Sequence, residues 1–223
     1  MPVIGIDINK LKSLIGKDIP SDDLVKKLTE IGCDVEGIEN LKRFKCLNCD
    51  GLTEITEGED KPAYCSICGI DFRERKDSIK EISPTTVIRM ELLAVRPDIF
   101  DAGGLSRGLK GYLGIEKGLK NYTLKKPTVT IKVDTAVESV RPYIVGAVIK
   151  NINFDDDSIK TIMKLQENLH WALGRNRKHA SIGVYDYDKI NGDFLFTAKP
   201  GDFKFIPLGY EIKPENSISI EKI

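Results

Sequence analysis

The segment that decides the fold reads Arg89-Met-Glu-Leu-Leu-Ala-Val-Arg-Pro-Asp-Ile-Phe-Asp-Ala-Gly-Gly-Leu-Ser-Arg-Gly-Leu-Lys-Gly-Tyr-Leu-Gly114. Apolar and charged residues alternate at positions 88–92, which is the period of a half-buried strand. Pro97 ends that strand because it lacks a backbone N–H, and we expect Asp98 to cap the helix that follows. The segment therefore predicts a strand, a sharp corner and a glycine-rich helix.

Three glycines lie on one face of the predicted helix, at the spacing of successive turns. Each glycine costs about 1 kcal/mol relative to alanine in a helix interior, so their alignment indicates a flat face that another backbone approaches closely. The alternative is a surface helix that tolerates glycine. Together with the corner, these positions are the candidate structural or interface residues: Arg96, Asp98, Gly104, Gly108 and Gly111.

The residues before this segment complete a small α/β N-terminal domain. The predicted elements are a strand at residues 3–8, a helix at 9–15, a helix that Ser21 caps and Gly32 ends, and a strand at 33–38. Cys33 alternates with Val35 in the last strand, so we expect it to be a small buried residue rather than a metal ligand.

The cysteines mark out a region of a different kind. Four of the five form two C-x-x-C pairs, and fifteen residues separate the pairs. Thiolates two residues apart can face one ion from a tight turn, and two such knuckles complete a tetrahedron. The spacing predicts a zinc ribbon at residues 41–82, with a small strand at 52–56 and a structural zinc ion held by Cys46, Cys49, Cys65 and Cys68. The alternative is a redox dithiol, which usually occurs as a single C-x-x-C motif in a thioredoxin-like unit.

The remainder of the chain predicts a mixed α/β region. It follows a linker at residues 120–127 and contains a long helix at 158–173, which Asp157 caps. Strands are expected at 129–133, 143–149, 181–185, 194–198 and 203–206, with a turn at Asn191-Gly192. The apolar run at 143–149 is typical of a central strand that is covered on both faces. The sequence therefore predicts an α+β protein with two domains, 1–120 with the inserted ribbon and 121–223.

A short basic cluster follows the long helix. Arg175, Arg177 and Lys178 are candidate RNA or phosphate contacts, although a solvated turn that complements the helix C-terminus explains the same charges. His170, on the helix, has no serine or cysteine nucleophile pattern beside it, so it is more typical of a structural residue. We therefore assign no catalytic residue.

The overall charge restricts the kinds of partner. The chain has 34 basic and 34 acidic residues, and this balance gives no support for binding along nucleic acid over its whole surface, although it leaves room for a local basic patch. We find neither an apolar run long enough to cross a bilayer nor a signal peptide. We therefore expect a cytoplasmic protein with no membrane partner.

Several motifs resemble those of one family, the β subunit of phenylalanyl-tRNA synthetase of the archaeal and eukaryotic type. The chain is similar to the N-terminal part of that subunit at Arg96-Pro97-Asp98 and the helix after it, Val140-Arg-Pro-Tyr143, Leu165-Gln-Glu-Asn-Leu-His170 and Ala180-Ser-Ile-Gly-Val-Tyr-Asp186. The resemblance implies a heterotetrameric ligase that charges tRNA with phenylalanine, using ATP and magnesium. It implies that the α subunit carries the aminoacylation site, while the β subunit contributes assembly surfaces, tRNA contacts and an editing module that hydrolyses mischarged tRNA.

The resemblance also assigns roles to the two predicted domains. Residues 1–120 correspond to the N-terminal β-subunit domain, and residues 121–223 correspond to the first part of the editing-type, tRNA-binding domain. The implied partners are the α subunit, the remaining β-subunit domains and tRNA. The zinc ion is expected to be structural, and magnesium and ATP enter only through the family's complete enzyme.

The chain departs from the family pattern in three ways. Val95 stands where the family has asparagine, the zinc ribbon is an insertion, and the family's later editing motifs are not found, so no editing residue is carried over. Three functions stay open. They are a portion of the β subunit, a free-standing zinc-ribbon module that binds RNA or protein, and a trans-editing deacylase. Whether the chain itself acts as an enzyme is left open.

Overall fold

The computed structural model describes residues 3–123, 126–190, 192–207, 210 and 213–222. These residues contain four α-helices and eight β-strands, so the protein belongs to the α+β class, as predicted. None of these helices has the combination of length and apolarity that is needed to cross a bilayer.

The chain forms two compact units that interleave along the sequence. The first consists of Met1–Asn121 and Asn153–Val184, and the second of Tyr122–Ile152 and Tyr185–Ile223. This division differs from the predicted sequence domains, which stay a prediction. Each unit has its own architecture.

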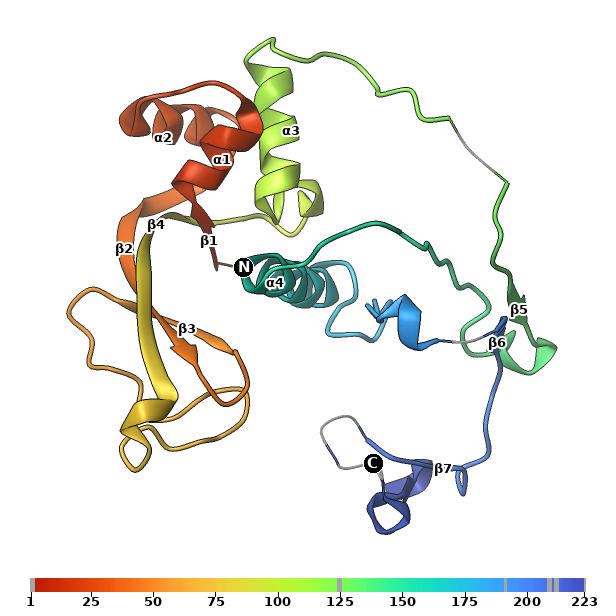
Figure 1. Ribbon diagram of the computed structural model, residues 1–223. Coiled ribbons are helices and arrows are strands. Elements are labelled where there is room, and N and C mark those ends of the chain that lie inside the picture. The colour runs from red at the N-terminus through yellow and green to blue at the C-terminus, as the bar shows by residue number, and fades with distance from the viewer. Residues whose placement is uncertain (1–2, 124–125, 191, 208–209, 211–212, 223) are drawn as a thin grey trace. The chain divides into compact units, whose positions relative to one another are not determined.

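The first unit is built on an antiparallel sheet of four strands in the order β1-β4-β2-β3. The strands are β1 (Val3–Asp7), β2 (Asp34–Cys46), β3 (Leu52–Thr56) and β4 (Ile79–Glu91). β2 and β4 pair along their whole length, from Asp34 opposite Glu91 to Cys46 opposite Ile79. They are the two long neighbouring strands in Figure 1.

This long pairing corrects the predicted strand boundaries. The sequence predicts a strand that ends at residue 38 and a separate ribbon from residue 41, whereas β2 runs through both without a break. A β-ladder continues for as long as each backbone finds a hydrogen-bonding partner, whatever the side chains do. The ribbon is therefore the far end of the same sheet, and the small strand predicted at 52–56 is confirmed as β3.

Three helices gather at the end of the long strands away from the ribbon (Figure 1): α1 (Ile8–Ile15), α2 (Ser21–Glu30) and α3 (Ala102–Tyr112). α1 begins where the side chain of Asp7 accepts a hydrogen bond from the N–H of Lys10 at 2.7 Å. α2 begins after Pro20 without a side-chain cap, so the predicted cap, Ser21, is instead its first helical residue.

The apolar faces of these helices and of the sheet form the core of the first unit. Its most completely buried members are Leu11, Leu24, Leu28, Ile88, Met90, Leu92, Leu105 and Leu109. They include the alternating residues Ile88, Met90 and Leu92 and, on α3, Leu105 and Leu109, so the predicted strand and the predicted helix after it are both confirmed. Cys33 is buried in the same core, as predicted.

The corner between β4 and α3 differs from the prediction. Pro97–Ile99 form a 3₁₀ turn, and Asp101 rather than Asp98 caps α3, with its carboxylate accepting hydrogen bonds from the N–H groups of Gly103 and Gly104 at 3.0 Å. The 3₁₀ turn separates Asp98 from the helix. Asp98 pairs instead with the guanidinium of Arg96 at 2.9 Å.

The three glycines of α3 have unequal surroundings. A Cβ atom on Gly104 would lie 1.9 Å from the carbonyl oxygen of Asp98, so the corner itself comes too close for any side chain there. A Cβ on Gly108 would meet only a methyl group of Ile99, at 3.7 Å, and one on Gly111 would meet the carbonyl of Glu116 at 3.8 Å. The close backbone approach is therefore found at one glycine, and an interface role for this face stays a prediction.

Helix α4 (Asp156–Ala172) also belongs to the first unit. Its cap is Asp155, whose side chain accepts a hydrogen bond from the N–H of Ser158 at 2.8 Å, so the predicted cap at Asp157 is wrong by two residues. Several aspartates in a row can each act as a cap, and only the extended backbone at residue 155 selects one. The side chains of α4 that pack against the core are Leu165, Leu169 and Ala172.

The second unit contains two short pairs of strands. β5 (Ile131–Val133) runs parallel to β6 (Phe194–Phe196), and β7 (Lys204–Phe205) runs antiparallel to β8 (Ile218–Ser219). Three of the predicted strands are thus present in shorter form. Parts of the predicted linker and turn, residues 124–125 and Asn191, lie outside the described residues.

The central strand predicted at 143–149 is wrong. These residues have no regular structure, and the side chains of Tyr143 and Val145 are 91% and 97% exposed. A strand requires a neighbour for its backbone groups, and no described strand pairs with this run. The strand predicted at 181–185 is also absent, since the backbone of Ile182 bonds to side chains of α4 instead.

Candidate metal centre

The four predicted metal ligands come together at the far end of the sheet. Cys46 ends β2, Cys49 lies in the turn before β3, and Cys65 and Cys68 lie in the loop between β3 and β4. Their Sγ atoms all lie within 4.8 Å of one another. Two of the separations are 3.8 Å, between Cys46 and Cys68, and 3.6 Å, between Cys49 and Cys65. All four are free thiols.

The two pairs are carried on turns of the same construction. The N–H of Cys46 donates to the carbonyl of Gly51 at 2.8 Å, and the N–H of Cys65 donates to the carbonyl of Ile70 at 2.9 Å. Gly69 adopts a left-handed φ of 73°, which is a conformation that glycine adopts without strain. Each hydrogen bond closes a tight loop around its pair, so both thiols of a pair face the same side.

The separations between the sulfur atoms fit a zinc ion. Zinc–sulfur bonds are about 2.3 Å long, so thiolates at the corners of a tetrahedron around zinc lie about 3.8 Å apart. The observed separations of 3.6 and 3.8 Å agree with this spacing. Four sulfur donors also fill the tetrahedral shell and leave no position for water. The cluster is therefore consistent with a structural zinc ion rather than with a catalytic one.

Burial and hydrogen bonding shift the pKa values of the cysteine thiols in opposite directions. Burial above all raises the pKa of Cys49 to about 12. Hydrogen bonds from the backbone N–H of Ile70 and from the side chain of Asn48 lower the pKa of Cys68 to about 6. N–H donors of this kind stabilise thiolates that face a metal ion.

The metal centre has little apolar support of its own. Its small cluster of buried side chains consists of Cys46, Cys65 and Phe72, with Ile70 and Ile79 packed against them in part. This cluster is separate from the core around the helices. The four sulfur atoms are thus the main organising groups at this end of the sheet.

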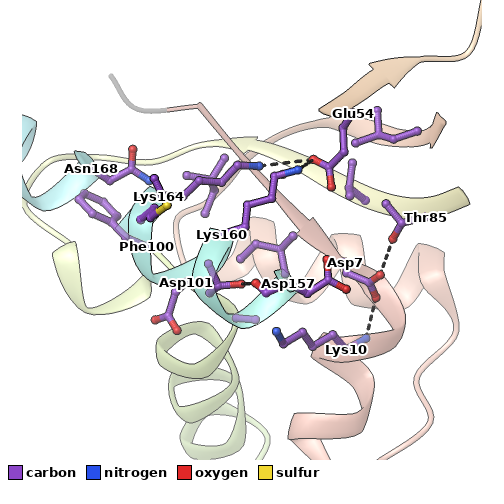
Figure 2. Close-up of a pocket in the computed structure, with 18 of the residues that line it drawn as sticks. Asp7, Lys10, Glu54, Thr85, Phe100, Asp101, Asp157, Lys160, Lys164 and Asn168 are labelled. Carbon is purple, nitrogen blue, oxygen red and sulfur yellow. Dashed lines mark hydrogen bonds and ion pairs between the residues drawn. The ribbon is translucent and has the colours of Figure 1, made fainter. Parts of the chain in front are cut away.

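An ionic network beside the metal centre is not predicted from the sequence. It joins side chains of β2 and β3 to side chains of α4, and its members are Arg43, Lys45, Glu54, Asp156, Asp157, Lys160 and Lys164. Figure 2 shows Lys160 and Lys164 reaching towards Glu54. The network borders a cleft of about 660 Å³ between the sheet, the start of α3 and α4.

The network cannot be predicted from the sequence because its members lie far apart along the chain. The aspartates of α4 lie 111 and 114 residues from the lysine and the arginine that they meet. The available signal is the placement of Arg43 and Lys45 two residues apart, on one face of a strand, but a charged strand face is usually solvated. Only the fold brings the opposite charges together.

The charged groups of the network shift one another's pKa values. Burial alone would raise the pKa of Glu54, but the ammonium of Lys160, helped by Lys164 and Arg43, holds that pKa below its usual value. Burial lowers the pKa of Lys160, and the carboxylate of Glu54 offsets part of this effect. Glu54 is therefore ionised at neutral pH.

The predicted RNA contacts lie on a tight loop after α4. Arg175, Asn176 and Arg177 have φ angles of 46°, 56° and 65°, in the left-handed region that non-glycine residues rarely occupy. Arg177 pairs with the carboxylate of Glu167 on α4. Within the part of the chain that is described, Arg175 and Lys178 are exposed and form no ion pair.

His170 connects this loop to α4. Its buried ring accepts a hydrogen bond at Nε2 from the N–H of Ile182 at 2.7 Å, and Gln166 donates to the carbonyl of Ile182 at 2.9 Å. Glu167 lies 3.4 Å from Nδ1. These bonds hold residues on both sides of the basic loop, which is a structural role.

Comparisons with known proteins point to one family, although no family model matches the chain. The chain is 32% identical over 209 residues to the phenylalanine–tRNA ligase β subunit of Methanosphaera stadtmanae, a match that covers 93% of this chain and 29% of that protein. It is 46% identical over 167 residues to the β subunit from Methanocorpusculum labreanum, a match that covers 75% of this chain and 30% of that one. The chain belongs to the family of phenylalanine–tRNA ligase β subunits.

This β-subunit chain also matches a solved structure. An N-terminal fragment of the phenylalanyl-tRNA synthetase β subunit from Pyrococcus horikoshii superposes with a TM-score of 0.71 at 25% sequence identity. The match covers 99% of this chain and 51% of that fragment. The chain thus corresponds to the N-terminal part of the β subunit, and its matches span 29% and 30% of the length of the two curated relatives.

In this β-subunit chain, the structure brings the four predicted cysteines together and leaves the other candidates elsewhere. Neither the basic residues after α4 nor the corner and glycines of α3 belong to the cysteine cluster. The ionic network beside that cluster is the feature that sequence reasoning missed.

Proposed function

We propose that this chain is the N-terminal part of a phenylalanine–tRNA ligase β subunit, with a role in subunit assembly and tRNA contact during ATP-dependent charging of tRNA with phenylalanine. The observation that carries the proposal is the similarity to β subunits along nearly the whole chain. Because the chain spans less than a third of those relatives, aminoacylation, with its ATP and magnesium, is assigned to the rest of the complex.

Reconstitution tests this role. The full 223-residue chain is mixed with the cognate α subunit and the remaining β-subunit domains, and the product is analysed by size-exclusion chromatography with light scattering and by tRNA charging. We expect the chain to co-elute with both partners and charging to depend on its presence. No association, and charging that is the same without the chain, would overturn the proposal.

Two assays on the chain alone, run beside the reconstitution, distinguish two other functions. RNA binding by the chain alone, without association with the other parts, would favour a free-standing zinc-ribbon module. Hydrolysis of tyrosine-charged tRNA by the chain alone would favour a trans-editing deacylase. A part of the β subunit should instead associate with the other parts, whether or not it also binds RNA alone, and should not hydrolyse the charged tRNA by itself.

We infer that Cys46, Cys49, Cys65 and Cys68 hold one structural zinc ion. The support is the approach of all four sulfur atoms to within 4.8 Å of one another, with two separations of 3.6 and 3.8 Å, and the small apolar cluster around them. Metal analysis of the purified chain should find about one zinc ion per chain, since four thiolates complete one tetrahedral site. Absence of zinc from protein that was purified without chelators would contradict this inference.

We also propose that Arg175, Arg177 and Lys178 contact tRNA phosphates. The alternative is that these cations only complement the C-terminus of α4. Backbone groups already satisfy two of the last carbonyls there, because the N–H of Gly174 bonds to Leu169 and the N–H of Arg177 bonds to His170. The exposed cations of Arg175 and Lys178 are therefore left available for an external anion, while Arg177 pairs with Glu167.

A salt titration of binding to a tRNA transcript tests this contact. Arg175→Gln combined with Lys178→Gln should weaken binding several-fold. It should also make the slope of log affinity against log salt concentration shallower, by the equivalent of about one to two phosphate contacts. Lys80→Gln combined with Lys117→Gln removes two other exposed cations without a described ion pair, and this control should bind like the unaltered chain. Equal affinity and equal salt dependence in both double variants would argue against the loop.

A further inference from the structure

One lysine touches both the metal centre and α4. The ammonium of Lys45 lies 2.9 Å from the carboxylate of Asp156 in the first turn of α4, and 3.1 Å from the carboxylate of Asp50. Lys45 directly precedes Cys46, and Asp50 directly follows Cys49. A single side chain thus joins the first cysteine knuckle to the start of the helix.

A second set of contacts lies beside the first. Arg43 pairs with Asp157 of α4 and lies 3.8 Å from Glu54 of β3, while Lys160 and Lys164 of α4 lie 2.7 and 3.6 Å from the same glutamate. The side chains of Arg43 and Glu54 are only 14% and 19% exposed. Sheltered pairs that share partners in a network hold their geometry better than isolated surface pairs do.

The two halves of α4 are held in different ways. Its C-terminal half carries the side chains that pack on the apolar core of the first unit: Leu165, Leu169 and Ala172. Its N-terminal half faces the ionic network instead, where β2 and β3 supply every partner named above. Those partners sit on the stretch of sheet that leads to the small cysteine cluster.

We propose that the metal-bearing end of β2 and β3 is the docking surface for the N-terminal half of α4, so that metal binding keeps this half of the helix in place. The inference rests on the proposed zinc ion. Without an ion, the four thiols no longer share a common ligand, and the turn that carries Cys46 and Cys49 loses its organising group. Lys45 and Asp50 lie within or beside that turn, so the helix contact is lost with it.

Hydrogen exchange measured by mass spectrometry tests the coupling. The full chain is compared with zinc bound and after removal of zinc by a chelator. We expect amides at 46–70 to lose protection, and amides at 157–165 to exchange at least tenfold faster. Amides at 9–15 and 102–112, which lie in α1 and α3, should be unchanged.

The outcomes separate this inference from the zinc proposal. Loss of protection at 46–70 with full retention at 157–165 would overturn the docking role while leaving the metal centre intact. No change in either region would overturn the structural zinc ion, and the docking role with it.

Variants of the ion pair test the same contact in metal-loaded protein. Asp156→Asn leaves every cysteine unchanged and should speed exchange at 157–165 about threefold or more, with zinc content unaltered. Glu36→Gln removes an ion pair of similar length, with Arg89, elsewhere on β2, and should leave α4 unaffected.

A double-mutant cycle completes the test. Lys45→Gln should match Asp156→Asn in its effect on α4, and the two changes together should be no worse than either alone, because they remove the same pair. Effects that simply add would mean that the two residues act on α4 independently, which would overturn the proposed contact.

Discussion

The long strands β2 and β4 have two ends that are stabilised in different ways. At one end, Ile88 and Met90 are completely buried against the helices, in a core of many apolar side chains. At the other end, Cys46 and Cys65 lie in a small cluster around four sulfur atoms. The two strands pair all the way between these ends, with register shifts at Val35/Gly37 and Leu41/Arg43. A sheet can therefore extend beyond its apolar core where another group supplies the free energy that apolar burial supplies elsewhere.

The largest expected effect is at the metal end. Cys46→Ser should abolish zinc binding and unfold residues 46–70, because structural zinc sites supply roughly 10–16 kcal/mol of binding free energy in small zinc-dependent folds. Metal analysis and hydrogen exchange measure both effects. Cys33→Ala is the matched control, since this buried cysteine lies in the helical core, and it should retain zinc. If the cysteine end stayed folded without metal, the contrast between the two ends would collapse.

The core end should respond to the loss of apolar volume instead. Leu11→Ala removes a completely buried side chain from α1 and should cost about 2–5 kcal/mol in the free energy of unfolding. Leu14→Ala, in the same helix but 39% exposed, should cost less than about 1 kcal/mol. Denaturant unfolding measures both values. An equal cost for the two leucines would mean that the core does not stabilise this end as described.

The glycines of α3 sharpen the description of the core end. Gly104→Ala should destabilise the fold by about 1–3 kcal/mol, because the new Cβ would collide with the carbonyl of Asp98. Gly108→Ala should be neutral or stabilise by up to about 1 kcal/mol, since its surroundings leave room for a methyl group and alanine favours helix.

The predicted interface can be tested on the same helix. Gly108→Leu should leave the isolated chain folded and weaken its association with the other parts of the ligase, if this face is an assembly surface. Thermal unfolding of the chain and the reconstitution experiment separate the two effects. Unchanged association would mean that this face of α3 is not an interface and that glycine is merely tolerated at position 108.

The smallest expected effect concerns the corner before α3. Asp101→Ala should cost about 1 kcal/mol, because it removes the side chain that accepts the first N–H groups of the helix. Asp98→Ala removes only an exposed pair with Arg96 and should cost less than about 0.5 kcal/mol. Thermal unfolding of the two variants decides between the cap that the sequence predicts and the cap that the structure has.

Local features were predictable where the chemistry lies within a few residues. The spacing of the two C-x-x-C pairs predicts that all four cysteines share one site. The bounds of β3 were predicted correctly because its apolar residues and the turn residues beside it are adjacent in the sequence. The caps of α3 and α4 were misplaced because Asp98 and Asp157 each lie close to a second aspartate, at 101 and 155. Composition cannot choose between neighbouring aspartates, whereas backbone conformation does.

The sequence by itself determined the family, the cysteine cluster, the α+β class and the first two helices, because each of these follows from residue type and short-range spacing. Tertiary structure alone decided that β2 continues into the ribbon, that residues 143–149 form no strand, and that Lys45 meets Asp156. In each case the outcome depends on whether a partner distant in sequence is present beside the residue. A backbone N–H or C=O group needs a hydrogen-bonding partner and a charged side chain needs an opposite charge, and neither partner can be identified from the neighbouring sequence.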